Sequence, residues 1–427
     1  MATDPPPGTA AVASGFAGEV TYTARVVFPV AGPPLVGGTL TVRGDRVAAV
    51  EPRGARTPDV DLGNVALIPG LVNAHTHLDL SGARGLVPPT DAAHFTDWLR
   101  GVIAYRRGRT PEQVQTDVRA GLAEALDFGT TLIGDIAADG ASWDALAAAP
   151  ARAVVFRELI GLREGRLLEQ VKDHWEWVRR PGTGFARRAL SPHAPYSVRE
   201  MMLMWACRCG VPVTVHWMES PAEVELVGTH AGPFVAFLRD LGVWDEGQLI
   251  GGFRRTLAHA GLHAPALLLA HANYQPPDDL FRPNTTVVYC PRTHAAFGHP
   301  PHPVADFLAR GVRVCLGTDS LASNPDLDPL AEARFVRARR PDLPAETILK
   351  MVTLAGAEAL GWADETGSLE AGKSADAVAV PLPDRDAADP HELLLADHPG
   401  ERRTLFRGVW RPGVVAAGFS LRSGDAG

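Results

Sequence analysis

Histidine and acidic side chains follow short apolar stretches at several places in this sequence, and their types suit a metal ion. His75 and His77 form an HxH pair after one apolar run, and His216, His271 and Asp319 each follow another run. Side chains two apart on a strand point to the same side, so both imidazoles of such a pair can bind one ion. A third histidine and a carboxylate complete a nitrogen- and oxygen-rich set that suits zinc or ferrous iron and leaves room for water. The pattern predicts a catalytic metal site.

The chain contains eight short runs rich in Val, Leu, Ile or Ala, and the residues named above follow several of them. Short runs of this composition are typical of parallel strands buried on both faces. Helical patterns separate most runs; the clearest covers residues 111–128, which begins at a proline and is followed by Gly129. Eight β–α units predict an α/β protein with a (β/α)8 TIM barrel, whose active site lies at the C-terminal ends of the strands. A doubly wound sheet is the alternative, but it normally has fewer strands and a Gly-rich first turn. The runs are residues 66–72, 130–135, 153–160, 189–192, 211–215, 267–270, 286–290 and 312–316.

Short β-type runs stand at both ends of the chain, outside the region of the eight repeats. They cover residues 20–30, 38–42 and 46–50 at one end, and residues 375–381 and 404–415 at the other. We expect them to fold together into a small β-sandwich domain. The predicted domains are therefore a disordered tail (1–17), a composite β domain (18–64 plus 365–419) and a catalytic barrel (65–364).

Composition excludes several classes of protein. The chain has 427 residues, of which 46% are apolar and 21% charged, and its net charge of −8 argues against a nucleic-acid-binding surface. The apolar runs fall far short of the ~20 residues that span a bilayer, and four cysteines are too few for a disulfide scaffold. The first 17 residues lack the basic start and apolar stretch of a secretory signal. We expect a cytoplasmic protein with a small-molecule partner, no nucleic-acid or membrane partner, and a homodimer as the commonest kind of assembly.

Several motifs together resemble the amidohydrolase superfamily, and within it the mononuclear deaminase and chlorohydrolase branch. They are PGLVNAHTHLDLSG at residues 69–82, HxxE from His216 to Glu219, AHAN around His271, LGTDSLASN around Asp319, and GSLEAGKSADAVAV near the C-terminal end. The resemblance covers nearly the whole chain. His193 stands at the end of the fourth run, where binuclear relatives carry a lysine, and this supports a single metal ion. The segment CPRTHAAFGHP departs from the CPxSN pattern of better-known deaminases, which puts the contact from the seventh strand in doubt.

The resemblance implies a role for each motif residue. His75, His77, His216 and Asp319 would hold one divalent ion, Zn²⁺ or Fe²⁺, which lowers the pKa of bound water from about 15.7 to about 7. His271 and Asp319 would orient that water and take its proton. Glu219 would protonate the ring nitrogen beside the attacked carbon, and ammonia would leave. The implied activity is hydrolytic deamination of a cyclic amidine.

Two segments narrow the expected substrate. Residues 77–103 and CPRTHAAFGH resemble aminodeoxyfutalosine deaminases, whose substrate is an adenine nucleoside with a benzoate tail and belongs to menaquinone biosynthesis. A carboxylate needs a cationic partner, ideally a bidentate arginine, and Arg84 and Arg292 are the candidates. His193 is expected to contact the substrate, and Trp98 could stack on a ring. Glu158, at the end of the third run, is expected to have a supporting structural role.

Three alternatives remain open. The substrate could be S-adenosylhomocysteine, methylthioadenosine or adenosine. A triazine chlorohydrolase fits less well, since some of those enzymes lose the acid of HxxE and Glu219 is retained. A barrel that serves as a metal-free scaffold would usually have lost metal ligands, and none is missing here.

Overall fold

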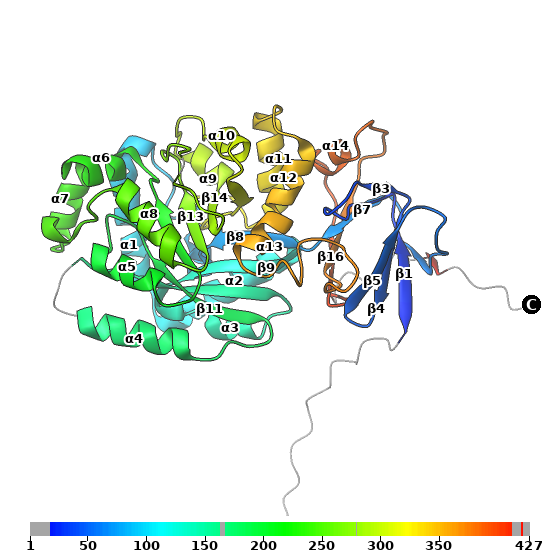
Figure 1. Ribbon diagram of the computed structural model, residues 1–427, viewed down its shortest axis with the longest axis horizontal. Coiled ribbons are helices and arrows are strands. Elements are labelled where there is room, and N and C mark those ends of the chain that lie inside the picture. The colour runs from blue at the N-terminus through cyan, green and yellow to red at the C-terminus, as the bar shows by residue number, and fades with distance from the viewer. Residues whose placement is uncertain (1–17, 163–166, 279, 412–419, 422–427) are drawn as a thin grey trace, which may run out of the picture.

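A computed structural model describes residues 18–162, 167–278, 280–411 and 420–421. The predicted N-terminal tail lies outside these residues, and so does the stretch 412–419 that we assigned to the small domain. Figure 1 shows the barrel and its surrounding helices on one side and the N-terminal strands, in blue, on the other. None of the described helices is both long and apolar enough to cross a bilayer.

Eight parallel strands follow one another in chain order around a single sheet, and helices cover its outside, so the predicted (β/α)8 TIM barrel is confirmed. Helix α2 shows why the local sequence folds as it does. Thr110 caps it in a capping box with Gln113, and Pro111 occupies its first turn. The apolar face of α2 (Val118, Leu122) is buried in the main core. The barrel strands are β8 (Leu71–Thr76), β9 (Thr130–Ala137), β10 (Arg152–Leu159), β11 (Ala186–Pro192), β12 (Val213–Trp217), β13 (Leu267–His271), β14 (Thr285–Tyr289) and β15 (Arg313–Leu316).

The helices alternate with these strands and continue past the last one. Their bounds are α1 (Phe95–Arg107), α2 (Pro111–Asp127), α3 (Trp143–Ala147), α4 (Leu167–Arg179), α5 (Glu200–Cys207), α6 (Pro221–Thr229), α7 (Pro233–Asp240), α8 (Phe253–His263), α9 (Pro291–Ala296), α10 (Val304–Ala309), α11 (Pro329–Arg339), α12 (Ala345–Met351), α13 (Leu354–Ala359) and α14 (His391–Leu394). Helix α1 is an extra helix between β8 and α2.

Strands from both ends of the chain share two smaller sheets. The five-stranded sheet has the order β19-β6-β1-β4-β5, and the six-stranded sheet has the order β18-β17-β16-β7-β2-β3. Leu40 and Val42 of the first sheet and Leu67 and Leu405 of the second belong to one buried apolar cluster. The strands are β1 (Glu19–Thr23), β2 (Val26–Val27), β3 (Leu35–Val36), β4 (Thr39–Arg43), β5 (Arg46–Glu51), β6 (Val60–Asp61), β7 (Val65–Pro69), β16 (Ala377–Pro381), β17 (Arg403–Phe406), β18 (Val409–Trp410) and β19 (Ser420–Leu421).

The run at residues 66–72 belongs to two strands, whereas the sequence suggested one. Strand β7 pairs with β16 and β2 in the six-stranded sheet, and only β8 enters the barrel. The chain changes sheet at Gly70, where a Cβ would lie 2.0 Å from Oγ1 of Thr131. Two buried strands in succession read as a single apolar run because both are covered on both faces. The domain boundaries given above stay a prediction.

The barrel closes where β15 meets β8, and this seam carries site residues. The Asn73 side chain donates to Oγ1 of Thr318 (2.8 Å) and accepts the Thr318 N–H (3.1 Å), while the Asp319 N–H donates to the His75 carbonyl (3.0 Å). A Cβ on Gly317 would lie 2.7 Å from the His75 Cβ and 2.8 Å from the His75 carbonyl oxygen. Only glycine lets the two strands come this close.

We therefore expect Gly317→Ala to lower the free energy of unfolding by about 1–3 kcal/mol, because the added methyl group must push the seam apart. Denaturant unfolding of the purified protein measures this. Gly184→Ala is the matched control, since no atom lies within 4 Å of the position of its added Cβ. Equal stability of the two variants would contradict the role of Gly317 at the seam.

Candidate metal centre and active site

The five predicted cluster residues meet at the C-terminal ends of β8, β12, β13 and β15. The Nε2 atoms of His77 and His216 are 3.2 Å apart. Oδ1 of Asp319 lies 3.7 Å from Nε2 of His75 and 3.5 Å from Nε2 of His77. His271 offers a ligand nitrogen within 4.8 Å of those of His75 and His216. All five side chains are buried, although they are separated by up to 244 positions in the chain.

The protonation chemistry of this cluster fits a divalent cation. Both ring nitrogens of His75 and Nε2 of His271 are buried and have no hydrogen-bond partner among the described residues. Burial lowers the pKa of His75 to about 3 and those of His77, His216 and His271 well below their ordinary value, so the imidazoles are neutral and carry free lone pairs. Buried lone pairs without a donor cost free energy unless a cation satisfies them. The residues present therefore fit a metal ion.

Neighbouring groups orient two of the candidate ligands. Nδ1 of His216 donates to the His193 carbonyl at 2.9 Å, which leaves the lone pair on Nε2, the atom that faces His77. Oγ of Ser323 donates to Oδ2 of Asp319 at 3.0 Å. Burial outweighs that hydrogen bond and raises the pKa of Asp319 to about 7.

The backbone at these strand ends is strained. Met218, His271 and Asp319 have φ values of 47°, 68° and 60°, in the left-handed region that non-glycine residues rarely adopt. Such conformations cost about 1–3 kcal/mol each and persist where surrounding contacts hold them. Part of the strained backbone among the described residues therefore lies at the histidine–aspartate cluster and at the turn that follows β12.

Glu219 lies beside the cluster, held by groups that sequence analysis missed. Its Oε1 is 3.5 Å from Nε2 of His271. The Glu223 carboxylate accepts the N–H groups of Met218 (3.0 Å) and Glu219 (2.9 Å), and the Asn273 side chain donates to the Glu219 carbonyl (2.9 Å). Burial, followed by the charges of Asp319 and Glu223, raises the pKa of Glu219 well above its ordinary value. The raised pKa favours the protonated form of Glu219, the form that a general acid needs.

One signal in the sequence could have indicated Glu223. Ser220 and Glu223 have the spacing of a helix capping box, and the Ser220 hydroxyl does accept the Glu223 N–H at 3.2 Å. The Glu223 carboxylate, however, accepts the N–H groups of Met218 and Glu219, the two residues before Ser220.

The predicted substrate-contacting residues do not all reach the site. His193 and Trp98 line a narrow cavity together with His77, His216, Glu219 and Asp319. Arg84 and Arg292 are not among the described residues that line it. Arg84 is 48% exposed and pairs with Glu124, and Arg292 pairs with Asp326 (2.6 Å) and Glu332 (2.6 Å). Both guanidinium groups thus have carboxylate partners away from the cavity.

Two charged residues of the cavity wall were not assigned to substrate from the sequence. Arg106, in the last turn of α1, donates to Oε2 of Glu158 (2.9 Å) and lies 3.2 Å from Oδ2 of Asp79. Glu158 lies on the cavity wall rather than in a purely supporting position. Its place at a strand end was the signal in the sequence. No sequence signal indicated that Arg106 lines the cavity, because basic residues are common in the last turns of helices.

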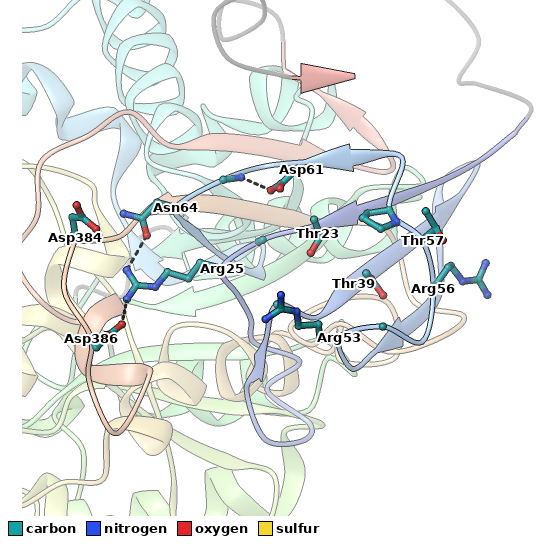
Figure 2. A pocket seen from close by; sticks show the side chains of 15 residues that line it. Thr23, Arg25, Thr39, Arg53, Arg56, Thr57, Asp61, Asn64, Asp384 and Asp386 are labelled. Carbon is teal, nitrogen blue, oxygen red and sulfur yellow. Dashed lines mark hydrogen bonds and ion pairs between the residues drawn. The ribbon is translucent and has the colours of Figure 1, made fainter. Parts of the chain in front are cut away.

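A wider hollow of about 830 Å³ lies on the small sheets, and its lining is of a different kind (Figure 2). Arg25 there bonds to Asn64 (2.9 Å) and Asp386 (3.0 Å), and Asp61 accepts the Gly63 N–H. The hollow is lined by arginine, aspartate, asparagine and threonine side chains together with glycines, an alanine and a proline, so it lacks the imidazole cluster described above.

The chain is similar to known proteins over most of its length. Residues 66–424 match the model of the amidohydrolase family. A 5-methylthioadenosine/S-adenosylhomocysteine deaminase of Moorella thermoacetica is 30% identical over 88% of this chain and 87% of that protein. One from Syntrophobacter fumaroxidans is 31% identical, over 80% of each.

Solved structures have the same fold. The aminofutalosine deaminase of Helicobacter pylori, in complex with methylthio-coformycin, has a TM-score of 0.80 at 21% identity and covers 92% of this chain and 100% of that one. An adenosine deaminase from Xanthomonas campestris with bound zinc has a TM-score of 0.71 at 25% identity, over 92% of each chain.

Proposed function

This chain belongs to the amidohydrolase family and is a hydrolytic enzyme, and on that basis we propose that it deaminates an adenine nucleoside derivative with the help of one divalent metal ion. The observation that supports this most is Glu219, a buried acid with a raised pKa that lies 3.5 Å from His271, at the edge of a cluster of neutral histidines. Deamination of a purine needs both an acid for the ring nitrogen and a site that activates water.

In the proposed reaction, His75, His77, His216 and Asp319 would hold the ion, for which we favour zinc. When bound, the ion supplies Lewis-acid chemistry that makes water nucleophilic near neutral pH. Glu219 donates its proton to ring nitrogen 1, which makes carbon 6 electrophilic. His271 and Asp319 orient the water and accept its proton as the oxygen adds to carbon 6. Asp319 passes that proton to the amino group, which leaves as ammonia, while the proton of the new hydroxyl returns to the Glu219 carboxylate and the 6-oxo product forms.

For the substrate, we place methylthioadenosine and S-adenosylhomocysteine ahead of aminodeoxyfutalosine. The two relatives described above are named as deaminases of the first two compounds, and they are similar to this chain over most of their length. Arg84 and Arg292 are both paired with carboxylates, and Arg106, the one arginine among the described residues that line the cavity, lies between Asp79 and Glu158. To pair with any of these three arginines, a benzoate would have to displace one of their carboxylate partners. Aminodeoxyfutalosine stays a prediction of the sequence motifs, tested in the same experiment.

The test is ammonia release, together with the ultraviolet shift from adenine to hypoxanthine, for zinc- or iron-loaded enzyme. Methylthioadenosine, S-adenosylhomocysteine, adenosine and aminodeoxyfutalosine are compared side by side, and chloride release from atrazine is measured separately. We expect kcat/KM of about 10⁴ M⁻¹s⁻¹ or more for at least one of the nucleosides, within the usual range of enzymes. A preference for aminodeoxyfutalosine would overturn our order of substrates. Loss of chloride without ammonia release would replace the deaminase with a chlorohydrolase, and inertness towards all of them would favour a scaffold.

A further inference from the structure

Two hydrogen-bond acceptors on the cavity wall face each other without a donor between them. Glu158 ends β10, its side chain is 3% exposed, and its Oε2 accepts from Arg106 at 2.9 Å. Its Oε1 is buried, has no hydrogen-bond partner in the described part of the chain, and lies 3.8 Å from Nε2 of His193. Both residues line the cavity that holds Glu219 and Asp319.

The hydrogen bonds around His193 are consistent with a tautomer in which its Nε2 is also an acceptor. The Ser197 hydroxyl donates its proton to the Ala194 carbonyl at 3.2 Å. We assign its oxygen as the acceptor in the 2.6 Å contact with Nδ1 of His193, which places the ring proton on Nδ1. Nε2 then carries a lone pair. Two acceptors cannot bond to each other, in agreement with their 3.8 Å separation.

Because Arg106 is already paired with carboxylates, this part of the cavity wall suits hydrogen-bond donors rather than anions. Burial acts to raise the pKa of Glu158, but the charge and hydrogen bond of Arg106 outweigh it and leave that pKa below its usual value. Arg106 also lies 3.2 Å from Asp79, so two carboxylates surround its single positive charge. The free Oε1 therefore belongs to an ionised carboxylate, which binds hydroxyl donors more strongly than a neutral acceptor does.

We propose that Glu158 and His193 form a diol-recognition pair that binds the 2′- and 3′-hydroxyls of a ribose, with one hydroxyl donating to Oε1 of Glu158 and the other to Nε2 of His193. Hydroxyls on adjacent carbons supply two donors side by side, which matches two acceptors at this separation. The inference rests on the proposed nucleoside deaminase function. It gives the site a means of selecting ribonucleosides over 2′- or 3′-deoxynucleosides.

The test compares adenosine with 2′-deoxyadenosine and 3′-deoxyadenosine on the metal-loaded wild-type enzyme. We expect the loss of either hydroxyl to lower kcat/KM by about 10- to 100-fold, because each loss leaves a buried acceptor unpaired. In Glu158→Gln, kcat/KM for adenosine should fall by a similar factor. The ratio of kcat/KM for adenosine to that for the better of the two deoxynucleosides should then be less than about threefold. Calorimetric binding of inosine, 2′-deoxyinosine and 3′-deoxyinosine should show the same loss of selectivity without any chemical step.

Asp79→Asn is the matched control, since it alters the other carboxylate next to Arg106 and should keep the preference for hydroxyls. Equal turnover of adenosine and both deoxynucleosides by the wild-type enzyme would overturn the diol-recognition pair and leave the deaminase function standing. So would a hydroxyl preference that survives in Glu158→Gln. If the wild-type enzyme turns over none of the adenine nucleosides, the proposed function itself fails. Equal turnover by the wild-type enzyme would overturn the pair even if the variant does not fold.

Discussion

Glu219→Gln lowers kcat by about 10²- to 10⁴-fold and leaves KM within a few-fold, if Glu219 is the proton donor to the purine ring. Glutamine has nearly the same shape but cannot give up a proton at neutral pH. The large effect is expected because the carboxyl is buried, and its pKa is raised by that burial and by the charges of Asp319 and Glu223, which favours the protonated form.

The measurement is steady-state deamination together with the metal content of each preparation. Glu225→Gln, on the exposed side of α6, is the matched control and should keep full activity. Metal content should be the same in wild type and both variants, because Glu219 is not among the four proposed ligands. A kcat within tenfold of wild type for Glu219→Gln would show that another group supplies the proton.

If the cluster is the metal centre, His216→Asn should remove the metal ion and lower kcat by at least about 10³-fold. His216 contributes the nitrogen 3.2 Å from that of His77, and its ring is held by the His193 carbonyl. Asparagine is too short to place a ligand atom at the position of Nε2. We expect less than about one tenth of the wild-type zinc or iron content after dialysis.

Thermal unfolding gives a second readout of the same site. A ligand present at about 1,000 times its dissociation constant stabilises the folded state by about 4 kcal/mol, so chelation should lower the Tm of the wild type by several degrees and leave the Tm of His216→Asn nearly unchanged. His263→Asn, at the exposed end of α8, is the control and should behave as the wild type in both experiments. Full metal content in His216→Asn would place the ion elsewhere.

The barrel and the composition of its metal cluster could be predicted from the sequence alone. The reason lies in the geometry of a closed parallel barrel, in which the C-terminal ends of all strands meet in one place. His75, His216, His271 and Asp319 each follow or end a recognisable apolar run, so local patterns were enough to bring together residues far apart in the chain. Roles for these residues as ligands or acids stay proposals until the variants are measured.

Which charged side chains line the cavity wall could not be predicted from the sequence and depended on the tertiary structure. Arg84 and Arg292 looked like free loop arginines, but their carboxylate partners lie 34 to 40 positions away, and no local pattern indicates such pairs. Arg106 reaches the cavity only because α1 packs over the mouth of the barrel, with Trp98 and Leu99 also lining it.

The sequence by itself thus determined which residues stand at strand ends, since a strand has a short-range signature and the barrel fixes where its end lies. The tertiary structure alone decided which long side chains reach the substrate and whether their charges are already matched. That outcome depends on the paths of the loops and on ion pairs between distant segments, and both are set by packing. Glu158 shows the division: its position at a strand end could be read from the sequence, but its free oxygen facing His193 could not.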